Sequence, residues 1–326
     1  MEKQENNCKL KLASGSGALK YYFLFMNCVV VCGPTASGKT KLAVQIANRL
    51  NGEILSADSR QVYRGMDIGT GKDLCEYAAD GKAVPYHLID IADPAQVYTL
   101  YNYQVDFYKA FEDVSSRGCL PVVAGGSGLY IEAVLKGYRI APVPENTALR
   151  KTLMNEPCET LLQMLKDEDP RLFAKTDTST KKRIVRGIEI ARAGLSNTSG
   201  RAVEFPAIDP LILYVVWDRS LLRARIEKRL CERLENGLVE EAARLLDTGI
   251  SPERFDLFGM EYKHAARYLT KKVSYEHMTK ELLRDIFHLA KRQDTWFRGM
   301  ARRGMEVRQV READLKEALN AIETVV

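Results

Sequence analysis

The sequence predicts an α/β fold, in which a parallel β-sheet is flanked by helices and carries an α-helical insert domain. Two observations support this prediction. Short apolar runs such as Val29–Val31 alternate with helical repeats through the first part of the 326 residues, and near residue 141 this alternation gives way to helical segments without a strong strand. Continuous apolar runs are typical of strands buried on both faces, as in parallel sheets. With 46% hydrophobic and 28% charged residues, the composition excludes a wholly disordered chain.

The first strand and the first helix follow from residue spacing. Val29–Val31 forms a short buried strand, and apolar residues then recur at a helical period from Lys41 to Leu50, where Asn51-Gly52 ends the helix. Further strands are predicted at 53–57, 87–91 and 120–124, and further helices at 100–117 and 129–135. Strands that alternate with helices predict parallel pairing with right-handed crossovers.

The second half of the chain is predicted to be mostly helical. A last core strand is expected at 211–217, and everything after it is expected to be helix, including 223–246 and 277–298. The predicted organisation is therefore an N-terminal extension at 1–27, a core at 28–140 and 210–326, and a helical insert at 141–209.

One glycine-rich loop carries recognisable chemistry. The segment at 33–40 reads GPTASGKT, which matches G-x-x-x-x-G-K-[ST] and lies between a predicted strand and a predicted helix. Backbone N–H groups of such a loop form a concave anion site at the positive end of the helix dipole. Lys39 would neutralise phosphate oxygens, and the Thr40 hydroxyl would hold Mg²⁺. The predicted diphosphate or nucleotide ligands are Gly33, Pro34, Thr35, Ala36, Ser37, Gly38, Lys39 and Thr40.

The loop predicts a P-loop NTPase-like core but does not name the reaction. Hydrolysing NTPases usually carry an Asp for Mg²⁺ at the end of a neighbouring apolar strand. Here the strand at 120–124 runs into Gly125-Gly126-Ser127-Gly128 instead. The sequence therefore disfavours a motor or switch NTPase.

A carboxylate follows the second predicted strand. Asp58 lies in Ser56-Ala57-Asp58-Ser59-Arg60-Gln61, and ligands of open parallel sheets bind at the carboxyl ends of the strands. Such a carboxylate can bind Mg²⁺ through water or accept a proton from a nucleophile. The alternative is an Asp that caps the next turn. Arg60 and Gln61 offer planar groups for phosphates or base edges.

Six segments occur in a distinctive order. They read GPTASGKT at 33–40, SADSRQVYRGMDIGTGK at 56–72, HLIDI at 87–91, VAGGSGLYIEAVL at 123–135, KRIVRGIEI at 182–190 and KRQDTWFR at 291–298. Together they resemble the tRNA dimethylallyltransferase (tRNA isopentenyltransferase) family. SADSRQ and GGSGLY are the specific elements, because GPTASGKT is shared with many nucleotide enzymes. No C-terminal zinc finger of the eukaryotic relatives follows Arg298, which favours the bacterial type.

The resemblance implies a reaction and roles for three residues. Family members transfer a dimethylallyl group from dimethylallyl diphosphate to N6 of the adenosine 3′-adjacent to the anticodon in tRNA, and diphosphate leaves. Asp58 matches the general base, Ser127 matches a position that touches the target nucleotide, and Lys39 with Mg²⁺ would stabilise the leaving diphosphate. The loop would then hold the donor's diphosphate rather than ATP.

The resemblance also implies a tRNA-binding surface that recognises the anticodon stem-loop. The matching residues are Asp58, Ser59, Arg60, Gln61, Ser127, Arg150, Lys182, Arg183, Ile184, Val185 and Arg186. Lys182 stands where the family usually has Gln, and Arg183 and Arg186 share a helix face. From Lys181 to Val310 the chain has 26 Lys and Arg against 18 Asp and Glu, a balance of +8 that suits a polyanion. The insert at 141–209 is expected to take part in tRNA binding.

Two other functions stay open at this point. An adenylate isopentenyltransferase would use the same donor but needs no RNA-binding surface, and a P-loop small-molecule kinase would bind ATP. One departure also bears on substrate preference, since Phe258-Gly259-Met260-Glu261-Tyr262-Lys263 stands where many family members read G-Y-[KR]-[EQ].

The cellular location and the oligomeric state are predicted from features that the sequence lacks. The seven cysteines form no C-x-x-C pair, which fits a reducing compartment where they act as small apolar residues. No apolar run reaches the 18 residues that a membrane-spanning helix needs. A cytoplasmic monomer without a membrane partner is expected.

Overall fold

The computed structural model describes residues 26–194 and 205–325, so the predicted extension at 1–27 lies almost entirely outside the described residues. The chain forms two compact units. Unit 1 comprises the chain up to Lys136 and from Pro206 onward, and unit 2 is Gly137–Phe205. Unit 2 begins and ends slightly before the helical insert expected at 141–209.

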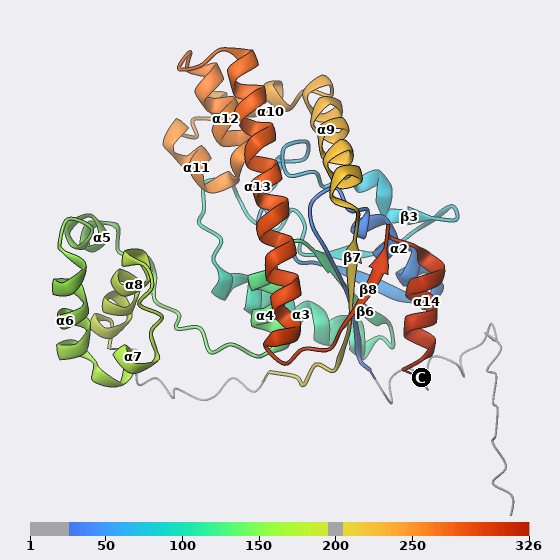
Figure 1. Ribbon diagram of the computed structural model, residues 1–326, viewed down its shortest axis with the longest axis horizontal. Coiled ribbons are helices and arrows are strands. Elements are labelled where there is room, and N and C mark those ends of the chain that lie inside the picture. Colours follow the sequence, from blue (N-terminus) through green and yellow to red (C-terminus); the bar gives the residue numbers. More distant parts are fainter. Residues whose placement is uncertain (1–25, 195–204, 326) are drawn as a thin grey trace, which may run out of the picture. The chain divides into compact units, whose positions relative to one another are not determined.

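Unit 1 is built on a six-stranded sheet with the order β5-β2-β6-β1-β7-β8 (Figure 1). Each neighbouring pair is parallel, as predicted, and Val29 of β1 lies between Val122 of β6 and Leu211 of β7. The strands are β1 (Cys28–Cys32), β2 (Gly52–Ser56), β5 (Tyr86–His87), β6 (Leu120–Gly125), β7 (Pro210–Val216) and β8 (Val307–Arg311). A separate antiparallel hairpin joins β3 (Ala78–Ala79) to β4 (Lys82–Ala83).

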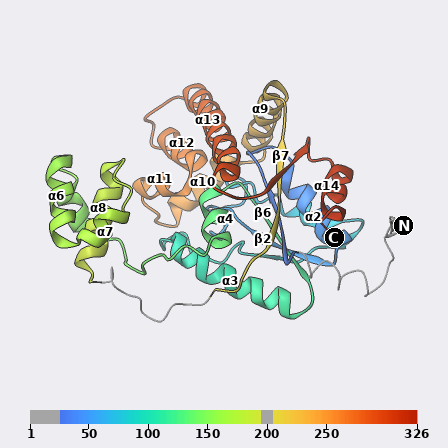
Figure 2. The same cartoon turned by 60° about the horizontal axis from the view of Figure 1, so that its bottom comes forward.

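Helices cover both faces of this sheet, which explains its apolar strands. Val29 and Val31 belong to one core with α2 (Lys39–Arg49) and α14 (Leu315–Glu323). Because successive side chains of a strand point to opposite faces, the alternate residues face α3 (Leu100–Ser116), α4 (Gly128–Leu135) and α13 (Tyr275–Arg302). Tyr214 of β7, for example, meets Phe297 of α13 with the ring centroids 5.7 Å apart. Figure 2 separates α3 from α14 across the strands.

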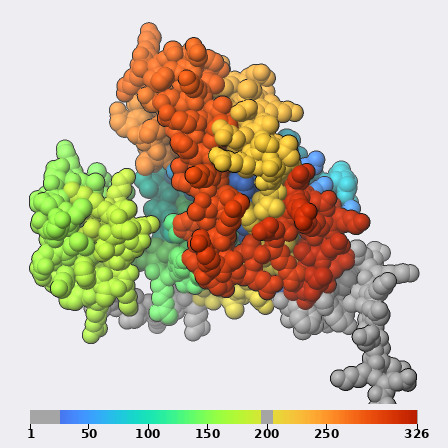
Figure 3. Space-filling view, in the orientation of Figure 1, coloured from blue at the N-terminus to red at the C-terminus, as the bar shows by residue number. Residues whose placement is uncertain are grey.

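Of the remaining helices of unit 1, α9 and α12 pack against α13, α10 and α11 pack against α12, and η1 packs against α2. Figure 3 shows α13 as a long ridge beside α9, and both share an apolar core that includes Ile226, Leu230, Leu282 and Ile286. A second small core joins the aromatic rings of Phe255, Phe258 and Tyr262. The elements are η1 (Leu74–Tyr77), α9 (Arg219–Glu235), α10 (Leu238–Asp247), η2 (Pro252–Arg254), α11 (Phe255–Phe258) and α12 (Met260–Leu269).

Unit 2 is a small helical body with its own core. It contains α5 (Thr147–Leu153), α6 (Cys158–Glu168), α7 (Pro170–Lys175) and α8 (Lys181–Arg192). Its core includes Leu161 and Leu165 from α6 and Ile184 and Ile188 from α8. Apolar residues at spacings of three and four explain why α6 and α8 pack against each other.

Three predicted elements were wrong in detail. The strand at 87–91 ends after His87, because Leu88 (φ 67°) and Asp90 (φ 56°) adopt left-handed backbone conformations. The helix at 223–246 is divided at Gly237 (φ 97°) into α9 and α10. The segment after residue 217 is not entirely helical, because β8 pairs in parallel with β7.

Candidate active site

The phosphate loop, Asp58 and Ser127 come together at one edge of the sheet. They follow β1, β2 and β6, and β6 lies between the other two strands. Parallel strands place their carboxyl ends at the same edge. The structure therefore brings together three segments of the chain, of which the first, at Gly33–Thr40, and the last, at Ser127, are more than 80 residues apart.

The phosphate loop is held by residues from the C-terminal half. Trp217 Nε1 donates to the Ser37 carbonyl at 2.9 Å, and Arg225 Nε donates to the Ala36 carbonyl at 2.8 Å. The Arg225 guanidinium also lies 4.3 Å from the Trp217 ring centroid. Ser37 Oγ is buried without a hydrogen-bond partner among the described residues. A buried hydroxyl of this kind is satisfied when an anion oxygen enters the loop.

Lys39 lies among like charges. Its Nζ donates to the Pro34 carbonyl at 3.3 Å. Burial and the charges of Arg229 and Arg233 lower the pKa of Lys39 to about 8, although Asp58 acts in the opposite direction. This crowding of cations favours an anion in the loop, because a diphosphate would relieve the repulsion.

Asp58 and Ser127 belong to one interlocked turn. Ser127 N donates to the Ala57 carbonyl at 3.2 Å, and Ser59 N donates to Ser127 Oγ at 3.2 Å. Asp58 Oδ1 accepts from Arg60 N at 2.9 Å, so the capping role considered for this carboxylate is present. Its other oxygen leaves room for a second role, since an ionised carboxylate accepts several hydrogen bonds.

The other residues of the predicted recognition turn are partly engaged within the protein. Gln61 accepts from Ser56 Oγ at 3.0 Å and donates to the Gly71 carbonyl at 3.0 Å. The Arg60 guanidinium donates to the Leu257 carbonyl, which connects the turn to α11. Ser59 is half-buried beside them.

Gln293 is a site residue that the sequence reasoning missed. Its Oε1 accepts from Thr35 N at 2.8 Å, and its Nε2 donates to the Gly126 carbonyl at 3.0 Å. One amide therefore connects the phosphate loop to the loop that carries Ser127. Gln293 lies within the KRQDTWFR segment, so the signal was present as a motif although no role was assigned to it.

The predicted tRNA-contacting residues of unit 2 differ in their environments. Ile184 and Val185 are only 2% and 1% exposed, which contradicts a surface role for their side chains. They face the core because α8 is amphipathic. Lys182 and Arg183 are exposed, and Arg183 pairs with Asp177.

Two further arginines of unit 2 are bound to a buried carboxylate. Arg150 contacts Glu189 at 2.8 and 2.7 Å, and Arg186 contacts it at 3.0 Å. Burial opposes ionisation of Glu189, but hydrogen bonds from Arg150, Asn146 N and Arg186 bring its pKa below the ordinary value. Arg150 and Arg186 therefore have a structural partner within the unit.

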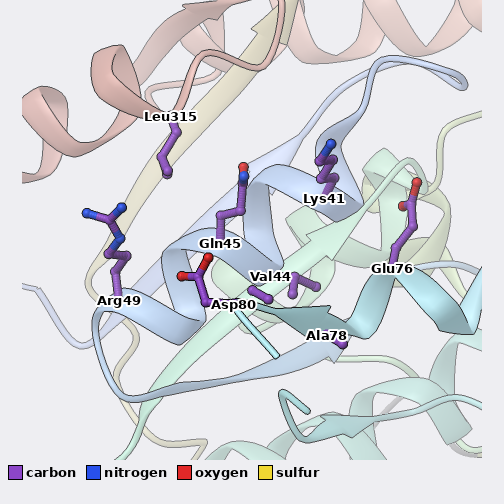
Figure 4. Close-up of a pocket in the computed structure, with 9 residues that line it drawn as sticks. Lys41, Val44, Gln45, Arg49, Glu76, Ala78, Asp80 and Leu315 are labelled. Atoms are coloured by element: carbon purple, nitrogen blue, oxygen red, sulfur yellow. The ribbon is translucent and has the colours of Figure 1, made fainter. Parts of the chain in front are cut away.

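A cavity lies along α2, and none of the phosphate-loop residues 33–40 lines it. Figure 4 shows Lys41, Gln45 and Arg49 of α2 along it, with Glu76 and Asp80 opposite. Its volume is about 220 Å³, and neither Asp58 nor Ser127 lines it. The phosphate-loop edge thus remains the candidate site.

The sequence predictions about membrane spans and cysteines can be compared with the structure. Among residues 26–194 and 205–325 no helix is long and apolar enough to cross a membrane. The six cysteines of these ranges are free. Cys28 and Cys32 are buried as expected for small apolar residues, and burial raises the pKa of Cys28 to about 12, but Cys75, Cys158 and Cys231 are exposed.

Comparison with known proteins gives consistent matches. The family model for IPP transferase matches residues 61–300, and that for isopentenyl transferase matches residues 26–80. The tRNA dimethylallyltransferase 1 of Syntrophus aciditrophicus is 49% identical over 296 residues, 91% of this chain and 97% of the relative. The tRNA dimethylallyltransferase 2 of Bacteroides fragilis is 49% identical over 282 residues, 86% of this chain and 92% of the relative.

Solved structures agree with these sequence matches. The tRNA isopentenylpyrophosphate transferase of Bacillus halodurans has a TM-score of 0.65 at 30% identity and covers 92% of this chain and 98% of its own. A eukaryotic dimethylallyltransferase acting on tRNA has a TM-score of 0.72 at 24% identity and covers 89% of this chain and 74% of its own. The second likeness supports the fold alone.

Proposed function

The chain belongs to the IPP transferase family, that of the tRNA dimethylallyltransferases, and we propose that the edge formed by Gly33–Thr40, Asp58 and Ser127 is its active site. The enzyme transfers a dimethylallyl group from dimethylallyl diphosphate to N6 of the adenosine 3′-adjacent to the anticodon in tRNA. The observation that carries the assignment is the convergence of an anion-binding loop with a carboxylate and a hydroxyl at the ends of three neighbouring strands.

The phosphate loop would hold the diphosphate of the donor. Backbone N–H groups, the orphaned Ser37 hydroxyl and the Lys39 ammonium all favour an anion there. As the allylic C1–O bond breaks, the diphosphate keeps the electron pair, and these groups stabilise its growing charge. Mg²⁺ fits the Thr40 hydroxyl as a hard oxygen ligand and would supply further charge neutralisation.

Asp58 would act as the general base. The N6 nitrogen forms its bond to C1, and the proton that it loses passes to the Asp58 carboxylate. Ser127 Oγ already accepts the Ser59 N–H, so its own proton is available to the base of the target nucleotide. The adenosine must leave the stack of the anticodon loop to reach these groups, which costs a few kcal/mol.

The tRNA partner would be held by both units. Arg60 and Gln61 flank Asp58 in unit 1, and the exposed Lys182 and Arg183 on α8 offer phosphate contacts in unit 2. Arg150 and Arg186 would have to exchange their bonds with Glu189 before they could bind phosphates. We propose that the protein acts in the cytoplasm, where it meets tRNA, and that it acts as a monomer, because the phosphate loop, Asp58 and Ser127 all come from one chain.

A transfer assay tests this function. The purified full chain is incubated with Mg²⁺, radiolabelled dimethylallyl diphosphate and unmodified tRNA, with AMP as a parallel acceptor. Label is expected on tRNA adenosine. Asp58→Asn should lower kcat by at least about a hundredfold while donor binding persists, because general-base catalysis contributes about 10² to 10⁴. Asp247→Asn, an exposed Asp in the last turn of α10, serves as the matched control.

The remaining outcomes separate the alternatives. Label on AMP alone would identify an adenylate isopentenyltransferase. Turnover of ATP without label on either acceptor would identify a kinase-like activity. An Asp58→Asn variant as active as the parent would remove Asp58 from the role of base.

A further inference from the structure

Arg233 in the last turn of α9 is a buried cation with unused hydrogen-bonding capacity. Its side chain is 12% exposed, and its Nε has no partner among the described residues. Its nearest carboxylate is Glu261 of α12, with Nη1 and Oε1 3.5 Å apart. Charge-assisted hydrogen bonds are usually about 2.7–2.9 Å long. The contact to Glu261 therefore leaves most of the guanidinium donors free.

Arg233 lies beside the segment that contacts the Asp58 turn, because Gln61 donates to the Gly71 carbonyl at 3.0 Å and Arg233 packs against Gly71. A methyl group added at Gly71 would lie 1.5 Å from Arg233 Nη2 and 2.7 Å from Arg229 Nη2, so both guanidinium groups pack against the backbone of Gly71. Their charges both lower the pKa of Lys39. Arg229 is already paired with Asp73 and contacts the Gly71 carbonyl at 3.4 Å. Arg233 is thus the less satisfied of two arginines near Lys39.

We propose that Arg233 is an additional ligand for the diphosphate of the donor and that Glu261 holds it in position while the site is free. This inference rests on the proposed function, because it takes the ligand of the Gly33–Thr40 loop to be a diphosphate. A diphosphate offers several charged oxygens, and the planar fork of arginine suits them.

A purely structural ion pair is the competing interpretation. A buried ion pair stabilises a protein only when its geometry is good and its remaining donors are satisfied. The 3.5 Å separation and the orphaned Nε of Arg233 meet neither condition. An anion that enters beside Lys39 would supply the missing acceptors.

The proposal also gives a role to the segment that departs from the family pattern. Glu261 lies in Phe258–Lys263, the segment that departs from the expected G-Y-[KR]-[EQ]. The structure shows that this segment supplies the carboxylate that faces Arg233. The helices that carry the pair, α9 and α12, both lie beside α13 (Figure 1).

Binding of inorganic diphosphate to the full chain, measured by titration calorimetry with Mg²⁺, tests the proposal. Arg233→Met should raise the Kd for diphosphate at least tenfold. Because this variant leaves Glu261 buried without its cation, the double variant Arg233→Met/Glu261→Gln is measured as well and should show the same loss. Glu261→Gln alone should keep the affinity within threefold of the parent or strengthen it.

Two controls separate the loss of a diphosphate ligand from the loss of a structural ion pair and from the loss of any positive charge on α9. Lys228→Met removes an exposed cation from the same helix and should leave the Kd for diphosphate unchanged. In the transfer assay the double variant should raise KM for the donor at unchanged KM for tRNA, which loss of a structural pair would not do.

The outcomes are distinguishable from those of the proposed function. A double variant that is folded and binds diphosphate as tightly as the parent would overturn the role of Arg233, even if tRNA is modified. Tenfold weaker diphosphate binding without any transfer to tRNA would support Arg233 as an anion ligand and contradict the proposed reaction.

Discussion

At the residue scale, Lys39 and Asp58 take their properties from neighbours that are distant in the chain. Lys39 is half-buried and lies within the electrostatic reach of Arg229 and Arg233. Asp58 is held by its own turn, which Ser127 connects to β6. The residue types were evident in the sequence, but the cations that surround Lys39 come from α9 and could not be assigned to it from spacing.

The lowered pKa of Lys39 predicts a pH dependence of donor binding. Its pKa of about 8 means that the ammonium loses its proton as pH rises through 8, whereas an unperturbed lysine stays charged. KM for dimethylallyl diphosphate should therefore rise several-fold between pH 7 and 9, and steady-state kinetics over this range measures it.

Lys39→Arg provides the control for this prediction, because arginine stays protonated over the whole range. The variant should show a flat KM between pH 7 and 9, whatever its absolute value. An equally steep rise in the variant would mean that another group titrates.

At the scale of elements, close backbone approach holds the catalytic turn together. A methyl group added at Gly125 would lie 2.1 Å from the Ala57 carbonyl oxygen. The Ala57 carbonyl also accepts a hydrogen bond from Ser127 N, and Ala57 N donates to the Ala124 carbonyl at 2.8 Å. Glycine at this position lets β2 and β6 end side by side, with Ser127 bonded to the residues on both sides of Asp58.

Gly125→Ala should therefore harm both stability and catalysis. Overpacking against a backbone carbonyl costs about 1–3 kcal/mol, and the forced shift should displace Ser127 and lower kcat. Thermal unfolding and the transfer assay measure the two effects. Gly118→Ala is the control, since nothing lies within 4 Å of an added methyl there and only its positive φ is penalised. Equal effects of the two substitutions would contradict the argument.

Glu53 at the start of β2 predicts an acid-sensitive contribution to stability. Hydrogen bonds from Arg117 and His87, opposed by burial, lower its pKa to about 2. A carboxylate with a depressed pKa stabilises the fold above its unfolded pKa, and this contribution is lost as pH falls from about 4.5 towards 2.

Glu53→Gln should remove this part of the pH dependence. At pH 7 the variant should be less stable by about 1–3 kcal/mol, because Arg117 loses a charged acceptor. Denaturant unfolding at pH 7 and at pH 3 measures the difference, which should be smaller at pH 3. A constant difference at both pH values would show that the charge of Glu53 is unimportant.

At the scale of the whole molecule, charge is distributed for a polyanionic partner. The surplus of +8 between Lys181 and Val310 is shared between α8 of unit 2 and the C-terminal helices of unit 1. On α8, the apolar face that contains Ile184 and Val185 is buried, while Lys182 and Arg183 remain exposed. On this helix Arg186 is bound to Glu189 and Arg192 to Glu168, whereas Lys182 is exposed.

The double variant Lys182→Ala/Arg183→Ala should weaken tRNA binding several-fold without changing KM for the donor. Removal of two phosphate contacts should also reduce the slope of log Kd against the logarithm of the salt concentration by about one to two. Filter binding at several salt concentrations measures both quantities. Arg192→Ala, at the other end of the same helix and bonded to both carboxylate oxygens of Glu168, is the control, and an equal loss there would indicate a non-specific charge effect.

Much of the molecule was predictable from local patterns. The parallel sheet, the phosphate loop and the position of Asp58 follow from apolar runs, glycine spacing and strand ends, since each depends on residues adjacent in the chain. The errors have different causes, and the helix predicted at 223–246 is simply broken at Gly237 by a positive φ. β8 was missed because it depends on pairing with β7, far away in the sequence, and β5 is shorter than predicted because the backbone turns at Leu88 and Asp90.

By itself, the sequence determined the fold class, the family and the residue types of the reaction, because motifs and periodicity are local properties of the chain. Only the tertiary structure decided which side chains surround the residues that carry out the reaction. It placed Gln293 between two loops, directed Ile184 and Val185 into a core, and brought Arg233 and Glu261 together near Lys39. Contacts between distant segments depend on how helices pack on the sheet, and no local pattern encodes that geometry.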